Sequence, residues 1–436
     1  MSQTGTSGSA ERSRKLEHRS LSKLKLVKFS KNLALCVGTV VVLCLAAEVA
    51  LRFTYHPENL GTVVQFDKDL GWSLKPNSQL RSVDSEMDLD YRIKVNSVGM
   101  REREFSPVKA PGTKRILIIG DSIAFGTGVD AGLRFSDFID RALGDEAEVL
   151  NAGVCGWGTD QELIYYESKG RYLNPDVVVL EVTVANDILN NMLDHLFLGS
   201  APKPRFVLAG DSLGLDETKL IPPAPPVHHR IRNLLKRSRL LLFVKRRIDA
   251  VARSRAVREA PARKPRGFDK EGLDKIYSHW SVYEKSYDDR FEEGWRITEA
   301  LIDRLSVLCR QNGTELIVFE FPLKIEVDEP WRRELLEHYG IDPDRFDFSK
   351  PYRKLADFCA SRDIEFIYPL DEFRKASLHQ SLYFDKDTHP NMYGHAMAAK
   401  VLLETLRDGY DFHFSVSEPD LAHFPVAPQA IPGESH

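Results

Sequence analysis

The residues that could carry out nucleophilic chemistry lie far apart in this chain of 436 residues. Ser122 follows a Gly-Asp pair, and His389 ends the segment 385–389, which reads Asp-Lys-Asp-Thr-His. A serine hydroxyl is inert near neutral pH until an imidazole takes its proton during attack, and a carboxylate behind the imidazole holds its tautomer. The chain therefore contains the types of side chain that are needed to attack an ester carbonyl.

Two further segments supply groups that could stabilise the negative oxygen formed in such an attack. Residues 151–156 read Asn-Ala-Gly-Val-Cys-Gly, and residues 185–187 read Ala-Asn-Asp. The oxyanion needs hydrogen-bond donors that are fixed in place beforehand, and losing one typically costs about 10²–10³ in rate. Glycine-rich turns and asparagine amides can supply such donors, so we expect both segments to lie near the serine.

Short apolar runs alternate with stretches of helical spacing along most of the chain. The predicted strands are 115–120, 148–151, 177–182, 315–321 and 365–368, and the predicted helices are 135–143, 159–171, 297–309, 352–361 and 392–407. This alternation predicts a doubly wound parallel sheet over residues 113–410, with an insertion at about 190–290. Ligands bind beyond the carboxyl ends of such strands, and each chemistry-bearing segment follows a predicted strand.

Taken in this order, the blocks resemble the SGNH (GDSL-type) hydrolase superfamily. The resemblance covers residues 113–190 and 295–410. It implies a flavodoxin-like α/β sheet and the hydrolysis of ester bonds, with neither a cofactor nor a metal. The cluster of acids beside His389 could bind a divalent ion, but hydrolases of this type need none.

The resemblance also assigns roles to residues of the matching motifs. Ser122 would be the nucleophile and His389 the general base. The oxyanion hole would be formed by backbone N–H groups of Ser122 and Gly156 and by the side chain of Asn186. An aspartate close to His389 would orient the imidazole and complete a catalytic triad.

The sequence departs from the family pattern at two positions. Where relatives often have a glycine two residues before the asparagine, this chain has Val184, whose side chain could narrow the oxyanion loop. The common Asp-x-x-His spacing would need an acid where Lys386 stands. Asp387 instead matches the Asp-x-His variant of polysaccharide-acetylation relatives, so we predict Asp387 as the acid and keep Asp385 in reserve.

A second Gly-Asp-Ser occurs at residues 210–212, and with Leu213 it matches the GDSL motif letter for letter. No glycine block of the oxyanion type follows it. The flanking segments 205–209 and 213–215 instead predict a hairpin, with Gly-Asp-Ser as its turn.

The N-terminal part of the chain predicts a membrane anchor. Residues 1–31 hold eight Lys/Arg and two Asp/Glu, and residues 32–53 form an apolar run of the ~20 residues that span a bilayer. The positive-inside rule then places the N-terminus in the cytoplasm and the rest outside it, in the periplasm of a Gram-negative cell. A cleaved signal peptide and a buried helix are the alternatives. Residues 54–112 are expected to be an irregular juxtamembrane segment, and 411–436 a C-terminal tail.

Composition adds a second basic segment inside the insertion. The chain is 42% hydrophobic and 28% charged, which excludes a disordered or collagen-like protein. Its net charge of −4 conceals a strong segregation, because residues 228–266 hold fourteen Lys/Arg against two Asp/Glu. This segment is either a solvated helical lid or a basic amphipathic helix on an anionic membrane. Nucleic acid is a poor partner for a domain outside the cytoplasm.

These features together predict a membrane-anchored serine esterase. Its substrate would be an acylated, above all acetylated, carbohydrate or lipid of the cell envelope. An O-acyltransferase for envelope polysaccharide, working with polysaccharide-export or acetylation machinery, would use the same residues. An inactive scaffold or glycan-binding module with the same fold is the third hypothesis.

Overall fold

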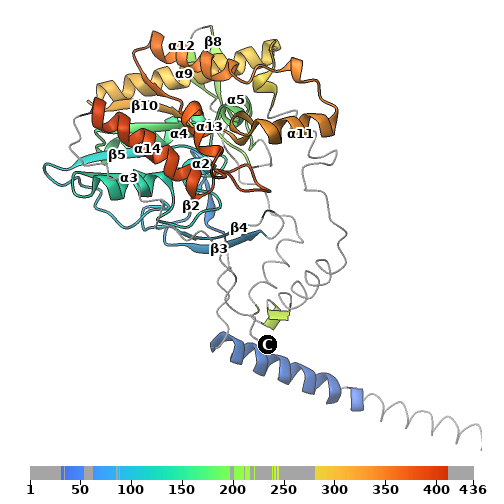
Figure 1. Ribbon diagram of the computed structural model, residues 1–436. Helices are drawn as coiled ribbons and strands as arrows, with labels where there is room; N and C mark the ends of the chain where they lie inside the picture. Colours follow the sequence, from blue (N-terminus) through green and yellow to red (C-terminus); the bar gives the residue numbers. More distant parts are fainter. Residues whose placement is uncertain are drawn as a thin grey trace, which may run out of the picture. The chain divides into compact units, whose positions relative to one another are not determined.

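The structure is a computed structural model of the chain (Figure 1). The residues it describes are 31–33, 35–53, 62–84, 87, 89–196, 201–210, 212–216, 220, 238, 240–241, 243–244 and 280–410. The chain divides into two compact units. One comprises Met1–Pro57 with Ala224–Arg263, and the other comprises Glu58–Pro223 with Lys264–His436.

The larger unit is built around a parallel sheet of five strands. In spatial order these are β11 (Glu365–Ile367), β10 (Glu315–Glu320), β7 (Val177–Val182), β5 (Lys114–Ile119) and β6 (Ala147–Asn151). Every neighbouring pair is parallel. Numbered along the chain, this order is 2-1-3-4-5, which is the flavodoxin-like doubly wound arrangement. The predicted fold class is therefore confirmed.

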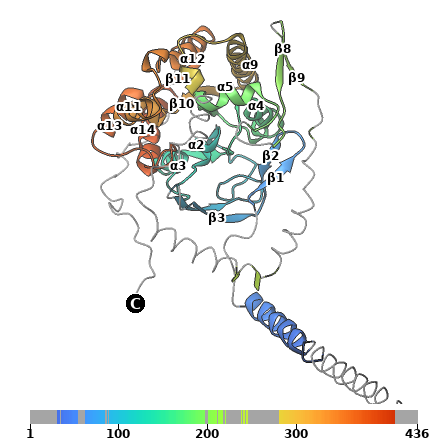
Figure 2. The ribbon, with the colours of Figure 1, turned by 90° about the vertical axis from the view of Figure 1, so that its right-hand side faces the viewer.

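Helices cover both faces of the sheet (Figures 1 and 2). Successive side chains of each central strand point to opposite faces and so enter two different core clusters. Ile116 and Ile118 belong to one core cluster, and Leu117 and Ile119 belong to the other. The first cluster includes residues of α3 (Phe135–Leu143), α13 (Leu370–Ser377) and α14 (Met392–Gly409). The second includes residues of α4 (Thr159–Ser168), α5 (Val184–Met192), α9 (Asp289–Gln311) and α12 (Lys350–Ser361). Strands buried on both faces explain the continuous apolar runs in the sequence.

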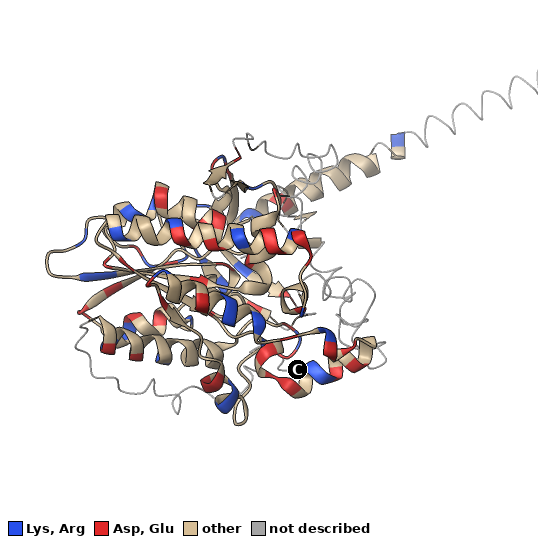
Figure 3. Ribbon diagram, turned by 90° about the horizontal axis from the view of Figure 1, so that it is seen from above, with Lys and Arg blue, Asp and Glu red and all other residues tan. Residues whose placement is uncertain are grey.

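The outer surfaces of these helices carry charges of both signs, as Figure 3 shows. Ion pairs join α9 to α12 through Lys354–Glu299 at 3.3 Å and Arg362–Asp303 at 2.9 Å. Pairs as exposed as the second contribute only about 0–1 kcal/mol each, so the fold is stabilised mainly by burial of the two core clusters.

The segment expected to be irregular and juxtamembrane, 54–112, is instead folded over most of its described length. β1 (Val64–Asp67) pairs antiparallel with β2 (Gly71–Leu74), and β3 (Gln79–Asp84) pairs antiparallel with β4 (Leu89–Lys94). Trp72, Tyr91 and Ile93 are buried in the same cluster as the central sheet. In β4 buried and exposed residues alternate, which is the pattern of a strand with one face on a core. The hairpins therefore belong to the larger unit, and the expectation was wrong here.

The strands of the sheet begin and end within one residue of their predicted bounds, and the helices differ more. The predicted helix 159–171 ends at Ser168, and a short 3₁₀ helix, Gly170–Leu173, follows it. The predicted helix 297–309 begins eight residues earlier as α9, where the Asp288 carboxylate accepts a hydrogen bond from the backbone N–H of Phe291. The sequence reasoning missed α5, α10 (Lys324–Val327), α11 (Glu329–Tyr339) and α13.

The second Gly-Asp-Ser lies in a hairpin, as predicted. β8 (Phe206–Ala209) pairs antiparallel with β9 (Ser212–Leu215), and Ala209 lies opposite Ser212. Gly210 has a φ of 65°, the left-handed region that turn glycines favour. The hairpin packs beside α9 (Figure 2). Asp211 lies outside the described residues.

The smaller unit contains a helix at Lys31–Phe53. Its most apolar 18-residue window has a mean hydropathy of 2.4 and is not buried by the rest of the chain. Length and composition would allow it to span a membrane, although a signal sequence has the same character. Its Glu48 carboxylate accepts hydrogen bonds from Ser238 Oγ at 2.7 Å and Leu240 N at 2.9 Å. Most of the basic segment 228–266 and both predicted tails, except Lys31, lie outside the described residues.

Candidate active site

Ser122 stands at a sharp turn from strand to helix at the carboxyl end of β5. It is the first residue of the short helix α2 (Ser122–Phe125). Asp121 caps this helix, because its carboxylate accepts a hydrogen bond from the backbone N–H of Ile123 at 2.8 Å. A side chain at Gly120 would lie 2.5 Å from Glu181 Oε2, so only glycine fits at the turn. The serine hydroxyl is thus presented at the edge of the sheet where ligands bind.

The three predicted triad residues lie in one hydrogen-bonded row. His389 Nε2 is 2.9 Å from Ser122 Oγ, across 267 residues of sequence. His389 Nδ1 is 2.5 Å from Asp387 Oδ1, and that same oxygen accepts a hydrogen bond from the backbone N–H of His389 at 2.7 Å. Asp387 is therefore held by both the ring and the backbone of the residue that it would orient.

Asp385, the reserve candidate, has a different role in the structure. The hydrogen bond from the ring Nδ1 of His389 goes to Asp387. Asp385 instead offers its backbone carbonyl to Lys324 Nζ at 3.2 Å. The geometry therefore favours Asp387 as the residue that orients the imidazole.

The pKa shifts of Asp387 and His389 support Asp387 as the residue that orients the imidazole. Burial by itself would raise the pKa of Asp387, but hydrogen bonds and charge from His389, with the charge of Lys324, outweigh it and lower the pKa. Burial would likewise lower the pKa of His389, but the hydrogen bond to Asp387 and the charges of Asp387 and Asp121 raise it above 6.5. The carboxylate is thus ionised near neutral pH and stabilises an imidazolium that forms beside it.

Asn186 lies in the first turn of α5, at the carboxyl end of β7. Its Nδ2 donates a hydrogen bond to Asp121 Oδ2 at 2.9 Å. An amide nitrogen carries two hydrogens, so one is left to donate to a substrate oxygen. Asp121, which precedes the serine, therefore orients the asparagine predicted to stabilise the oxyanion.

Gly156 lies in a loop that packs directly on the serine turn. The backbone N–H of Val154 donates to Gly120 O at 3.0 Å, and a Cβ at Gly153 would lie 2.5 Å from the backbone nitrogen of Phe125. Gly156 itself has a φ of 79°, and a Cβ there would lie 2.7 Å from Leu196 Cδ1. The left-handed backbone conformation favours glycine at this position.

Val184, which stands where relatives often have a glycine, is buried at the start of the helix that carries Asn186. Its side chain is 1% exposed and packs in the larger core cluster at the start of α5. The Val184 side chain is therefore directed into the core.

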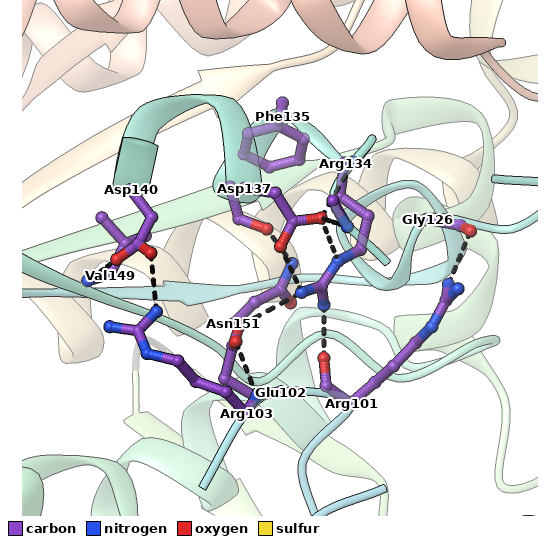
Figure 4. A network of polar contacts seen from close by, with 12 residues as sticks. Arg101, Glu102, Arg103, Gly126, Arg134, Phe135, Asp137, Asp140, Val149 and Asn151 are labelled. Atoms are coloured by element: carbon purple, nitrogen blue, oxygen red, sulfur yellow. Dashed lines mark hydrogen bonds and ion pairs between the residues drawn. The ribbon is translucent and has the colours of Figure 1, made fainter. Parts of the chain in front are cut away.

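Sequence reasoning missed the residues that connect the N-terminal hairpins to the serine helix (Figure 4). The buried guanidinium of Arg101 donates hydrogen bonds to the carbonyls of Phe125 at 2.8 Å, Gly126 at 2.7 Å and Val129 at 2.7 Å. Arg134 in turn donates to the carbonyl of Arg101. The available signal was the turn-like sequence Asn-Ser-Val-Gly-Met-Arg at residues 96–101, which ends in Arg101 and leads towards the predicted domain.

Buried carboxyl groups lie behind the serine turn. Glu181 accepts hydrogen bonds from the backbone N–H groups of Asp121 and Ala124, both at 3.3 Å. Glu162 is fully buried, and within the described part of the chain neither of its carboxyl oxygens has a hydrogen-bond partner. Burial raises the pKa of both carboxyl groups well above 4.5. The charge of Asp187 adds to this effect for Glu162, and the charges of Asp121 and Asp187 add to it for Glu181. Among the described residues, no group of three or more His, Cys, Asp or Glu is arranged to hold a metal ion.

Known proteins resemble this chain in structure at low identity. No protein-family model and no curated protein sequence matches it. A mutant acetyl-xylooligosaccharide esterase from Geobacillus stearothermophilus is 13% identical over 71% of this chain and 100% of its own, with a TM-score of 0.37. A lipolytic G-D-S-L family protein from Veillonella parvula is 12% identical over 68% and 99%, with a TM-score of 0.34. A GDSL-like lipase from Bacteroides thetaiotaomicron is 12% identical over 68% and 88%, with a TM-score of 0.31. Likenesses this distant do not decide function, which has to be argued from the site itself.

Proposed function

We propose that this chain is a serine esterase that removes acyl groups through Ser122, His389 and Asp387. The observation that carries this proposal is the continuous row from Ser122 Oγ to His389 Nε2 and from His389 Nδ1 to Asp387, with distances of 2.9 and 2.5 Å. These are hydrogen-bonding distances of a nucleophile with its general base and of that base with its orienting acid.

The proposed reaction has two halves. In the first, His389 Nε2 takes the hydroxyl proton while Ser122 Oγ bonds to the ester carbonyl carbon. The carbonyl oxygen becomes an oxyanion, which accepts hydrogen bonds from Gly156, Asn186 and the backbone N–H of Ser122. The carbon–oxygen bond to the alcohol then breaks, and the imidazolium returns its proton to the leaving alcohol. In the second half, water takes the place of the alcohol and releases the acid.

We propose an acetylated carbohydrate or lipid of the cell envelope as the substrate. The support is the apolar helix Lys31–Phe53 together with the basic residues that precede it. A span in this orientation would hold the catalytic unit outside the cytoplasm, where envelope polymers are found.

An O-acyltransferase is the second candidate. It would use the same acyl-enzyme, with a sugar hydroxyl in place of water. The Asp-x-His spacing at Asp387 and His389, the variant noted above for polysaccharide-acetylation relatives, favours this candidate. Such an enzyme could work with polysaccharide-export or acetylation machinery. The intact row of hydrogen bonds supports either enzyme over an inactive scaffold.

The test uses the full chain in detergent with an aryl acetate, in the presence and absence of an oligosaccharide acceptor. We expect Ser122→Ala to abolish turnover and covalent labelling by a fluorophosphonate. Ser212→Ala is the matched control, because it changes the second Gly-Asp-Ser, and it should leave both unchanged. Acetylated oligosaccharide would identify a transferase. A wild-type chain with neither turnover nor labelling of Ser122 would refute both enzymatic functions.

A further inference from the structure

The loop that carries Asp387 and His389 is fixed at its base. The backbone N–H of Phe384 donates to the carbonyl of His389 at 3.2 Å, and the N–H of Asn391 donates to the carbonyl of Leu382 at 2.9 Å. The side chain of Asn391 also donates to the carbonyl of Tyr383 at 3.1 Å. These contacts close the two ends of the loop on each other, but they leave the backbone just before Asp387 to be held by another element.

That element is α10, whose first residue is Lys324. Its Nζ donates to the carbonyl of Phe384 at 3.0 Å and to that of Asp385 at 3.2 Å. The residue is only 6% exposed, and its Nζ lies 5.0 Å from the ring centroid of Trp331. The buried ammonium therefore connects the start of α10 to the segment that leads into the triad acid.

A neutral donor could hydrogen-bond to both carbonyls, so the positive charge itself needs an explanation. Burying an ammonium is costly, and burial lowers the pKa of Lys324 although the charges of Asp328, Asp385 and Asp387 act to raise it. The same charge acts on the triad, because it contributes to the lowered pKa of Asp387. The cost of burial is thus incurred at a point where a cation favours an ionised acid.

We propose that Lys324 is a positioning residue of the triad: it fixes the backbone before Asp387 and keeps a cation beside that carboxylate. The kinetic consequences rest on the proposed function. The pKa of His389 can be measured without any activity. The proposed role of Lys324 and the proposed function can therefore fail separately.

The expected effect on pH dependence follows from the charges that face the pair. His389 is influenced by Asp387 and Asp121, and Asp387 by His389 and Lys324. Removing the lysine charge makes protonation of the pair easier. His389 then stays protonated to higher pH, and the acid limb of the activity profile, its low-pH side, should move towards higher pH.

Lys350 offers a matched control. Its Nζ donates to the carbonyls of Glu284 at 3.1 Å and Lys285 at 3.2 Å, and it lies 3.1 Å from the ring centroid of Tyr287. Replacing it removes the same kind of contact, a lysine that connects two carbonyls beside an aromatic ring, from a part of the fold that holds no triad residue.

The experiment measures the rate of fluorophosphonate labelling of Ser122 against pH in the full chain. We expect Lys324→Met to slow labelling at least tenfold and to shift the acid limb upward. Lys324→Arg should keep the acid limb in place because it keeps the charge. Lys350→Met should label as wild type does. A Lys324→Met chain with wild-type rate and limb, or an equal loss in Lys350→Met, would overturn the proposal.

Two further measurements keep the test decisive. If Lys324→Met does not fold, Lys324→Gln retains a donor for the carbonyls and removes only the charge, and an unshifted acid limb in that variant counts against the proposal. The ¹⁵N resonances of His389 can also be titrated in a Ser122→Ala background, which needs no activity. We expect the pKa of His389 to rise when Lys324 is replaced by Met, and an unchanged pKa would contradict the role of the charge.

Discussion

The choice between the two aspartates near His389 is made by single hydrogen bonds. The backbone N–H and the ring Nδ1 of His389 both contact Asp387 Oδ1. Asp385 instead offers its backbone carbonyl to Lys324. Two neighbouring residues of the same type thus have separate tasks. One is expected to orient the general base, and the other to anchor the loop through its main chain.

Replacing these two aspartates tests that division. Asp387→Asn should lower kcat by about 10³–10⁴, because the amide can hold the imidazole in the wrong tautomer. Asp385→Asn keeps the backbone carbonyl that accepts from Lys324, so its kcat should stay within a few-fold of wild type. Steady-state kinetics on an aryl acetate measure both variants. If Asp385→Asn showed the larger loss, the assignment of the acid would be reversed.

The buried Glu162 predicts a dependence of stability on pH. Burial, followed by the charges of Asp187 and Glu181, raises the pKa of Glu162 in the folded state well above 4.5. Above about pH 4.5 the unfolded chain has lost this proton while the folded chain keeps it, so folding becomes less favourable as pH rises towards the folded pKa.

Glu162→Gln removes this titration. We therefore expect the Tm of the variant to rise relative to that of wild type as the pH is raised from 4.5 to 8. Thermal melts across this range measure the difference, with the exposed Glu372→Gln as the control. A Tm difference that does not change with pH would show that Glu162 titrates alike in both states.

At the scale of elements, the N-terminal hairpins support the helix that presents the serine. The Arg101 guanidinium donates to the carbonyl of Arg92 in β4 at 2.8 Å and also to carbonyls at the end of α2 and just beyond it. The carbonyls at the end of a helix have no partner within the helix, and a buried cation stabilises them. The hairpins and the serine turn therefore form one structural unit.

Arg101→Met should destabilise the larger unit by roughly 3 kcal/mol or more, because several buried carbonyls would lose a charged donor. Urea denaturation measures this loss, and Arg92→Met is the control because the side chain of Arg92 is exposed. Equal stability of the two variants would mean that the carbonyls find other partners.

Some of the strands and helices could be predicted from the sequence, and others could not. The central strands, buried on both faces, appear as apolar runs such as 177–182, and their order along the chain suffices to predict a parallel sheet. β1 and β2 have only four residues each, and β3 and β4 carry charged residues on their exposed face, so the segment 62–94 contains no continuous apolar run and looked irregular. α5 was missed because its polar residues, including Asn190 and Asn191, are buried by partners distant in sequence.

At the scale of the whole molecule, the chain combines a helix of membrane-spanning length with a larger compact unit that holds the candidate active site. The basic residues of 1–31 predict a cytoplasmic N-terminus. A reporter enzyme that is active only outside the cytoplasm, fused after residue 60, should therefore be active in cells. Replacing Lys23, Lys25, Lys28 and Lys31 with Glu is the matched test of orientation and should reduce that activity. A reporter that is silent after residue 60 would overturn the proposed topology.

The sequence by itself determined the order along the chain of the five strands of the central sheet, the types of the reactive residues and the apolar N-terminal run. These depend on local composition and periodicity, which a chain expresses without its tertiary contacts. The tertiary structure decided which aspartate faces His389, that Asn186 is oriented by Asp121, and that Lys324 contacts the triad loop. Each of these depends on two backbone segments, distant or adjacent in sequence, meeting at a hydrogen-bonding distance, and only the folded arrangement of the sheet sets that distance.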